Sequence, residues 1–270
     1  MEKSYSYIQK KTMDQMSING TSIKYGKESN IDEYWRQIAN CNDQSSRHEM
    51  IDQLLMIMEN NAAQNGFWRA DDEIRITFGI GSNAVHLDDK NIYYNFFDNL
   101  NYMYNKNNEL DVPLKDGAIA LRSVFGTIEN YFGPYNGDIN LRHQLTDMNF
   151  DTFEYPSISV LKGKGCGACV EKAAVAHNLW LLMGRESYYV SSTSSKFENS
   201  NDEGHAFCII KNSQDKYMLY DHAMNNFGPL SGEPIQTLLN GEPLIIKEPF
   251  KNQGVYANAL NLEKTNISTQ

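Results

Sequence analysis

Cysteine is scarce in this chain: four of its 270 residues are cysteine. So few thiols cannot form the dense disulfide framework of a small secreted domain, and a reactive thiol needs a reducing compartment. Long apolar runs are missing too: no stretch approaches the roughly 18 residues of a membrane helix, and the opening MEKSYSYIQKK lacks the apolar centre of a secretory signal. We expect a cytoplasmic protein without a membrane partner, or one exported by a route without a cleavable signal peptide.

Positive charge is in short supply as well. The chain has 24 Lys and Arg against 34 Asp and Glu, which gives a formal net charge of −10. This balance argues against a nucleic acid as a partner, because binding to phosphates needs a basic surface. Hydrophobic residues make up 41% of the chain, enough for a sizeable core in one large domain or two modest ones.

The patterning divides the chain into four regions. We interpret residues 1–29 as a polar leader that is mobile or loosely packed, 30–115 as a mainly helical N-terminal region, 116–250 as the core, and 251–270 as a polar tail. Capping residues and periodicity predict helices at 29–40, from Ser45 or Ser46 onward, at 92–104 and at 117–132, with a half-buried strand at 73–80.

A glycine-rich segment leads into an apolar helix that starts at Cys169. Glycine occupies every second position before it: Gly163, Gly165 and Gly167. The unpaired N–H groups and the positive dipole of a helix start favour a thiolate. One apolar stripe is predicted along the helix: Ala173, Ala176, Trp180 and Met183. The small residues near Cys169 would let a sheet approach the thiol closely.

An imidazole and a carboxylate follow on two predicted strands. His205 opens an alternating run, and Asp221 closes the apolar run that begins at Tyr217. Adjacent antiparallel strands would bring the two side chains together. A thiol, an imidazole and a carboxylate make up a nucleophilic triad, in which His205 takes the proton of Cys169 and Asp221 orients the imidazole.

These segments, GKGCGACVEKAAVAHNLWLLMG, EGHAFCII and YMLYDHAM, resemble the core of the transglutaminase-like superfamily, which is related to the papain-type cysteine proteases. Members carry a glycine followed closely by the nucleophilic cysteine, an alanine four residues later, and a helix that ends at a glycine before a strand. Ala173 and Gly184 fit this pattern, which selects Cys169 as the nucleophile. The resemblance covers roughly residues 116–223. Cys166 departs from it, because the family does not usually place a second cysteine there.

The resemblance implies an α+β fold with a transglutaminase-like, papain-like core, in which the nucleophile helix packs on an antiparallel sheet, and with a mainly helical N-terminal part. We expect the strands of this sheet at 187–192, 205–210, 217–221 and, less regularly patterned, 244–247.

The implied activity is a cysteine-dependent acyl transfer on an amide, through a thioester intermediate. The expected partner is a protein or peptide substrate, and deamidation or transglutamination of a glutamine side chain is the favoured reaction, with no cofactor and no metal. A cysteine peptidase and an amide-forming acyltransferase on a thioester substrate stay open as alternatives. The Cys169 backbone N–H would be one oxyanion donor. The second is left open among Tyr131, Tyr135, Asn136 and Gln144.

The same residues are also compatible with other classes of protein. Cys166 and Cys169 with His205 and Cys208 have the ligand types of a zinc site, but positions three apart on a strand face opposite ways. The spacing of Cys166 and Cys169 also suits a redox protein, or a reversible disulfide that switches the enzyme off. A non-catalytic binding module is the remaining alternative. His222 is expected to face away from the site if the strand continues past Asp221.

Overall fold

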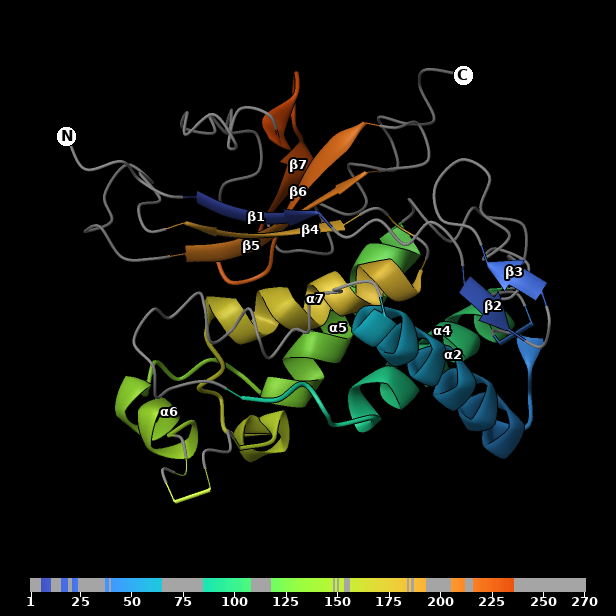
Figure 1. Ribbon diagram of the computed structural model, residues 1–270, viewed down its shortest axis with the longest axis horizontal. Helices are drawn as coiled ribbons and strands as arrows, with labels where there is room; N and C mark the ends of the chain where they lie inside the picture. The colour runs from blue at the N-terminus through green and yellow to red at the C-terminus, as the bar shows by residue number, and fades with distance from the viewer. Residues whose placement is uncertain are drawn as a thin grey trace.

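A computed structural model gives the fold, shown in Figure 1. It describes residues 6–10, 16–18, 21–23, 37–38, 40–64, 85–107, 118–147, 149, 151–152, 156–183, 185, 187–192, 205–211 and 216–235. Helices and an antiparallel sheet make this an α+β chain, as predicted. None of the described helices combines the length and the apolar character needed to cross a membrane.

The main sheet has five strands in the order β1-β4-β5-β6-β7, and every neighbouring pair is antiparallel. Its strands are β1 (Ser6–Lys10), β4 (Ser187–Ser192), β5 (His205–Lys211), β6 (Tyr217–Asp221) and β7 (Asn226–Pro229). The three strands predicted around the site are therefore confirmed, with β5 one residue longer. The strands predicted at 244–247 and 73–80 lie outside the described residues, and β7 was not predicted.

The sequence analysis assigned no strand to residues 1–29, yet β1 pairs with β4 at the edge of the main sheet. β2 (Met16–Ile18) and β3 (Thr21–Ile23) form a separate two-stranded sheet. An edge strand needs a partner on one side only and tolerates polar side chains on both faces. The weak alternation of Ser6–Lys10 therefore gave little signal.

The long helices follow the predicted pattern closely. They are α2 (Gln44–Gln64), α4 (Asn91–Asn107) and α5 (Ala118–Phe132). The capping prediction for α2 was wrong by two to three residues: Asp43 Oδ1 accepts the Ser46 backbone N–H at 2.8 Å. The carboxylate of Asp43 reaches the free N–H groups, and Ser46 itself lies inside the helix. Two short elements went unpredicted because they contain too few residues for periodicity: α6 (Ile139–Leu145) and the 3-10 helix η1 (Ile158–Leu161).

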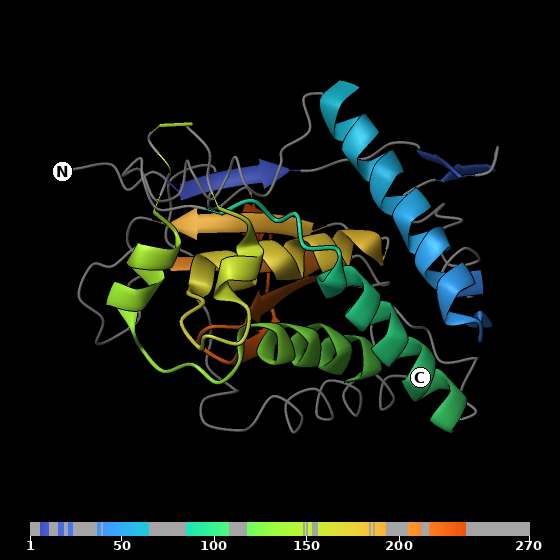
Figure 2. The same cartoon turned by 90° about the horizontal axis from the view of Figure 1, so that it is seen from below.

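The central helix α7 (Cys169–Leu182) lies between the sheet and α5, as Figures 1 and 2 show. The single apolar stripe predicted for it was wrong, because every residue from 170 to 180 is buried. A helix covered on all sides has no solvent face and hence no amphipathic pattern. Along β5, Cys208 and Ile210 belong to the core that contains α7, whereas Phe207 and Ile209 belong to a second cluster on the other face.

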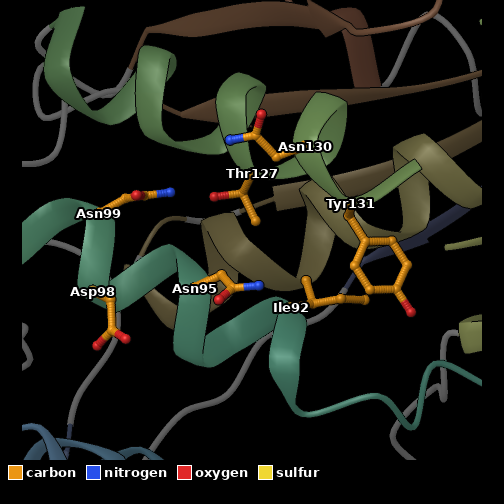
Figure 3. Close-up of a pocket in the computed structure, with 7 residues that line it drawn as sticks. All are labelled: Ile92, Asn95, Asp98, Asn99, Thr127, Asn130 and Tyr131. Carbon is orange, nitrogen blue, oxygen red and sulfur yellow. The ribbon is translucent and has the colours of Figure 1, made fainter. Parts of the chain in front are cut away.

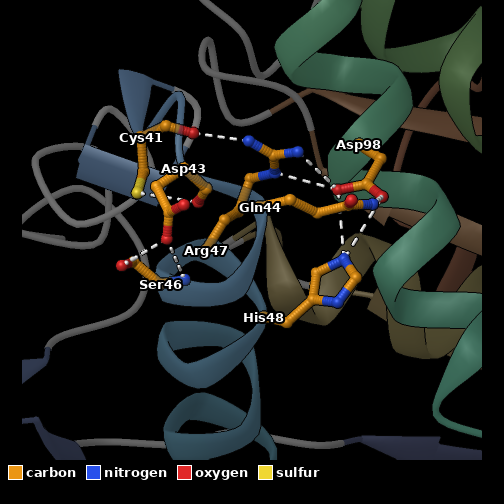
Figure 4. Close-up of polar contacts among 7 residues, drawn as sticks. All are labelled: Cys41, Asp43, Gln44, Ser46, Arg47, His48 and Asp98. Atoms are coloured by element: carbon orange, nitrogen blue, oxygen red, sulfur yellow. Dashed lines mark hydrogen bonds and ion pairs between the residues drawn. The ribbon is translucent and has the colours of Figure 1, made fainter.

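A cluster of polar contacts joins α2 to α4 (Figure 4). The Asp98 carboxylate accepts hydrogen bonds from Arg47 Nε at 2.9 Å and Gln44 Nε2 at 2.8 Å, and it lies 3.2 Å from His48 Nε2. These contacts hold the pKa of Asp98 below its usual value although its partial burial acts in the opposite direction. The His48 ring also stacks on Tyr94, with 4.2 Å between the centroids. The N-terminal helices are thereby tied to each other by charge as well as by apolar packing.

Candidate active site

Cys169 is the first residue of α7 and is half-buried. The start of this helix is capped from within: Glu171 Oε2 accepts the backbone N–H of Ala168 at 2.9 Å. The other oxygen of Glu171 accepts from Arg142 on α6, at 3.1 Å from Nε and 2.5 Å from Nη2. Both side chains are buried, 5% exposed for Arg142 and 0% for Glu171. A buried ion pair therefore fixes the backbone immediately before the thiol.

The loop before Cys169 needs glycine for steric reasons at two positions. Gly165 has φ +68°, and a Cβ there would lie 2.3 Å from the carbonyl oxygen of Pro134. A Cβ at Gly167 would lie 2.5 Å from the ring of Phe132. Only glycine lets the backbone approach so closely and adopt a positive φ without strain. These two glycines therefore let the loop pack tightly against the end of α5 and the residues that follow it.

Backbone hydrogen bonds hold the same loop in place. Gly163 N donates to Tyr131 O at 2.8 Å and Gly165 N donates to Phe132 O at 2.7 Å, both at the C-terminal end of α5. Asn136 N donates back to Gly165 O at 2.7 Å, and its Nδ2 donates to Lys164 O at 2.8 Å. The path of the chain into Cys169 is therefore set by α5 and by the loop that follows α5.

Two contacts fix how α7 lies along the sheet. Cys208 Sγ donates to Ala173 O at 3.2 Å, and His177 Nδ1 lies 2.9 Å from Ser187 Oγ, opposite Ile210 in the strand register. Four helical residues rise about 6 Å and two strand residues about 6.6 Å, so α7 and β5 run in the same direction and advance at a similar rate. One more such step carries Cys169 to the level of position 206. The thiol lies at the end of the sheet where β5 begins with His205.

Asp221 ends β6 at the same end of the sheet, one residue after Tyr220, which pairs with Cys208. It is fully buried, and its Oδ1 accepts the Met224 N–H at 3.1 Å. The pleat sets Asp221 on the face of Leu219, whereas Tyr220 faces α7. The structure thus brings the segments of all three predicted residues to one end of the sheet, but it sets Asp221 on the face opposite α7 and Cys169. The side chain of His205 lies outside the described residues, and with it the contact between imidazole and thiol.

The expectation for His222 applied to a strand that continued past Asp221, and the strand does not continue. β6 ends at Asp221, and the following turn directs the imidazole to α5, where Nε2 lies 2.8 Å from Glu129 Oε1. Lys172 Nζ on the first turns of α7 lies 3.4 Å from the same oxygen. The imidazole also stacks on Phe125, with 4.3 Å between the ring centroids. The sequence analysis missed this cluster of Glu129, Lys172 and His222.

The charges in this cluster follow from burial and hydrogen bonding. Burial lowers the pKa of His222, although the hydrogen bond to Glu129 acts in the opposite direction. The hydrogen bond from His222 holds the pKa of Glu129 below its usual value, and Lys172 adds to the effect. At neutral pH a neutral imidazole therefore donates its Nε2–H to a carboxylate. Nδ1 is then the acceptor for the Tyr220 hydroxyl, 3.3 Å away.

A turn signal in the sequence could have revealed this geometry. Asn225 and Asn226 stand next to each other just after His222, and Asn225 has φ 52°. Asparagine tolerates the left-handed region better than other non-glycine residues and is typical of tight turns. Reading the pair as a turn would have ended the strand at Asp221 and released His222 from the strand alternation. No pattern in the sequence, however, indicates Glu129 as its partner.

The structure narrows the choice of the second oxyanion donor. The Tyr131 hydroxyl donates to Asp89 Oδ2 at 2.9 Å, and its pKa is raised by burial and by that carboxylate. Asn136 uses its amide within the loop, and Gln144 is exposed on α6. Tyr135 is 59% exposed, and Lys172 Nζ lies 5.5 Å from its ring centroid. Of the four predicted donors, Tyr135 therefore combines an exposed side chain with a contact to α7.

The burial and hydrogen bonding of the cysteines can be compared with what a zinc site or a redox site would require. Burial, followed by the nearby charge of Glu171, raises the pKa of Cys166 and keeps it a thiol rather than the thiolate that binds metal or attacks disulfides. Cys208 is buried and donates its S–H to the backbone of α7. Within the described ranges, no three His, Cys, Asp or Glu side chains gather as a metal site would require. The four cysteines, Cys41, Cys166, Cys169 and Cys208, are thiols that form no disulfide.

The chain matches no protein-family model, no curated protein and no solved structure. The resemblance to the transglutaminase-like superfamily therefore depends on the residues of the three segments and on their spacing. A function for the site at the end of the sheet has to be inferred from its residues and their contacts.

Proposed function

We propose that this protein is a transglutaminase-like cysteine enzyme that transfers an acyl group from an amide, with the glutamine side chain of a protein as the preferred substrate. The observation that supports this most is the position of α7 along the sheet. The contacts of Ala173 and His177 bring Cys169, at a helix start, to the level at which His205 begins β5. A thiol that merely filled the core would need neither a helix start nor the constrained glycine loop before it.

In the proposed reaction His205 takes the proton of Cys169, and Asp221 orients the imidazole. The thiolate sulfur attacks the amide carbon, and the negative oxygen is held by the backbone N–H of Cys169 and the hydroxyl of Tyr135. The C–N bond then breaks, the imidazolium gives its proton to the leaving nitrogen, and ammonia departs. A thioester on Cys169 remains.

The acceptor decides the final product. Water, activated by His205, releases a glutamate side chain and restores the thiol, which is deamidation. A lysine amine in place of water gives an amide crosslink, which is transglutamination. A peptidase or an amide-forming acyltransferase would use the same thioester with another donor or acceptor. Cys169 is half-buried at the start of a helix, and this position is compatible with each of these reactions. The preference for glutamine therefore comes from the family resemblance.

Ammonia release from a mixed library of glutamine-containing peptides tests the proposal. Cys169→Ala should lower the release by at least about a thousandfold, because the nucleophile is lost. Cys166→Ala is the matched control: it removes a thiol three residues away in the same loop and should leave the rate nearly unchanged in reducing buffer. Release that survives Cys169→Ala, or that Cys166→Ala abolishes equally, contradicts the proposal.

A further inference from the structure

A polar groove lies between α4 and α5, apart from the Cys169 region (Figure 3). It has a volume of about 250 Å³. Its lining combines amide, hydroxyl, carboxylate and apolar groups: Ile92, Asn95, Asp98, Asn99, Thr127, Asn130 and Tyr131. None of these residues except Tyr131 has a role in the predicted chemistry, and the Tyr131 hydroxyl donates to Asp89.

Thr127 is the residue that singles out this groove. Its side chain projects from α5 into the space between the two helices, where Asn99 and Asn130 flank it (Figure 3). The residue is 2% exposed, and its hydroxyl has no hydrogen-bond partner among the described residues. A buried hydroxyl without a partner is unfavourable, and such groups in folded proteins generally bind a water molecule or a ligand.

The charges around the groove exclude an ionic ligand. Its one carboxylate, Asp98, already accepts from Gln44 and Arg47 and contacts His48. An incoming cation would therefore meet a carboxylate that is already compensated. No Lys or Arg lines the groove to attract an anion. A neutral ligand meets no unfavourable charge there.

We propose that this groove binds one ring of a small, neutral, polyhydroxylated ligand of the monosaccharide class. Each asparagine amide offers both a donor and an acceptor, which suits neighbouring hydroxyls, and the Thr127 hydroxyl completes the set at the floor. Ile92 and Tyr131 are 1% and 3% exposed, so they add only a small apolar area to a mainly polar lining. The volume lies below the roughly 300–1,000 Å³ of sites for drug-sized ligands, which limits the occupant to a single ring.

Titration of the full-length, ¹⁵N-labelled protein with N-acetylglucosamine, glucose and myo-inositol, each up to tens of millimolar, tests this inference. At least one probe should give saturable shifts of the backbone amides of α4 and α5 around Asn99 and Thr127. Thr127→Val keeps the shape and removes the hydroxyl, and it should weaken binding roughly three- to tenfold, the effect of one hydrogen bond. Ser123→Ala is the control, because it removes another buried hydroxyl of α5, which donates to Met103 Sδ outside the groove lining.

The free protein provides the second readout. A hydroxyl without a partner contributes nothing to the fold, so Thr127→Val should be at least as stable as the wild type in urea. A markedly less stable Thr127→Val would mean that the hydroxyl is bonded within the protein and would overturn the inference. The inference would also be overturned if no probe gave saturable shifts, or if wild type and Thr127→Val bound with equal affinity. The groove would then be a site for water molecules only.

Discussion

His222 Nε2 lies 2.8 Å from Glu129 Oε1, across the boundary between the sheet and the helices. The contact joins the end of β6 to α5, and Lys172 extends it to α7. Three elements that surround the proposed site therefore meet in one partly buried polar cluster. The cluster has consequences for stability and its pH dependence that can be measured without any substrate.

The first prediction concerns pH. Burial depresses the pKa of His222 below its usual 6.5, so the unfolded chain binds a proton more readily than the folded one. The free energy of unfolding should therefore be constant above about pH 6.5 and should fall as the pH drops below it. Glu129, whose pKa is also depressed, adds a loss at lower pH, below its usual 4.5. Urea unfolding between pH 5 and 8 measures the effect.

The variant His222→Gln separates the imidazole from the other titrating groups. It should be less stable at pH 7 but should have a smaller decline between pH 6.5 and 5 than the wild type. His143→Gln is the control, because it removes an exposed imidazole of α6 and leaves the contacts of His222 intact. Equal slopes in wild type and His222→Gln would refute the assignment of a depressed pKa.

The second prediction concerns the buried pair at the start of α7. Glu171→Ala removes the acceptor of both Arg142 and the Ala168 N–H, so a buried guanidinium loses its counter-charge. The free energy of unfolding should fall by about 3–5 kcal/mol. Glu171→Gln keeps an oxygen for the helix start and should lose less. Denaturant unfolding of the two variants decides the point, and a loss in Glu171→Ala of well under 1 kcal/mol would contradict it.

The third prediction uses two glycines with the same backbone angle. Gly163 and Gly165 both have φ +68°, but a Cβ at Gly163 meets open space, whereas one at Gly165 lies 2.3 Å from Pro134 O. Gly163→Ala should destabilise the protein by about 1 kcal/mol, the usual effect of a left-handed alanine. Gly165→Ala should lose clearly more, because the backbone must also shift. Similar unfolding free energies for both variants would mean that the loop yields without strain.

Much of this arrangement could be predicted from the sequence, for identifiable reasons. α4, α5 and the strands β4 to β6 follow from periodicity, and the start of α7 follows from the glycines before Cys169. The prediction failed where tertiary contacts decide. Complete burial removed the stripe expected on α7, and the pairing of β1 with β4 depends on residues that lie far apart in the sequence.

The candidate site likewise contains residues that the sequence indicates and residues that it does not. Cys169, His205 and Asp221 stand out because their types and order have chemical meaning. Glu129 and Lys172 do not, since a carboxylate and an ammonium on helices are most often solvated surface groups. The contacts of Glu129 with His222 and with Lys172 depend on how α5 and α7 pack beneath the sheet. The groove at Thr127 likewise arises from the packing of two helices.

The fourth prediction concerns Asp221, which accepts the Met224 N–H and lies on the face of Leu219. If Asp221 orients His205, Asp221→Asn should lower the reaction rate by about a hundredfold or more, because the amide holds the imidazole in the wrong tautomer. If Asp221 only holds the turn, Asn can accept the same N–H, and the rate should be nearly normal. The pH–rate profile distinguishes the two cases, since loss of the carboxylate should also lower the pKa of the imidazole.

The most direct test of the central claim is the pH dependence of iodoacetamide labelling at Cys169, followed by mass spectrometry in the wild type, His205→Ala and His222→Gln. If His205 activates the thiol, the wild type should be labelled at neutral pH much faster than free cysteine, and His222→Gln should keep this rate. His205→Ala should be labelled at neutral pH no faster than free cysteine, because the thiol has lost its base. Unchanged labelling in His205→Ala, or its loss in His222→Gln alone, would contradict the account.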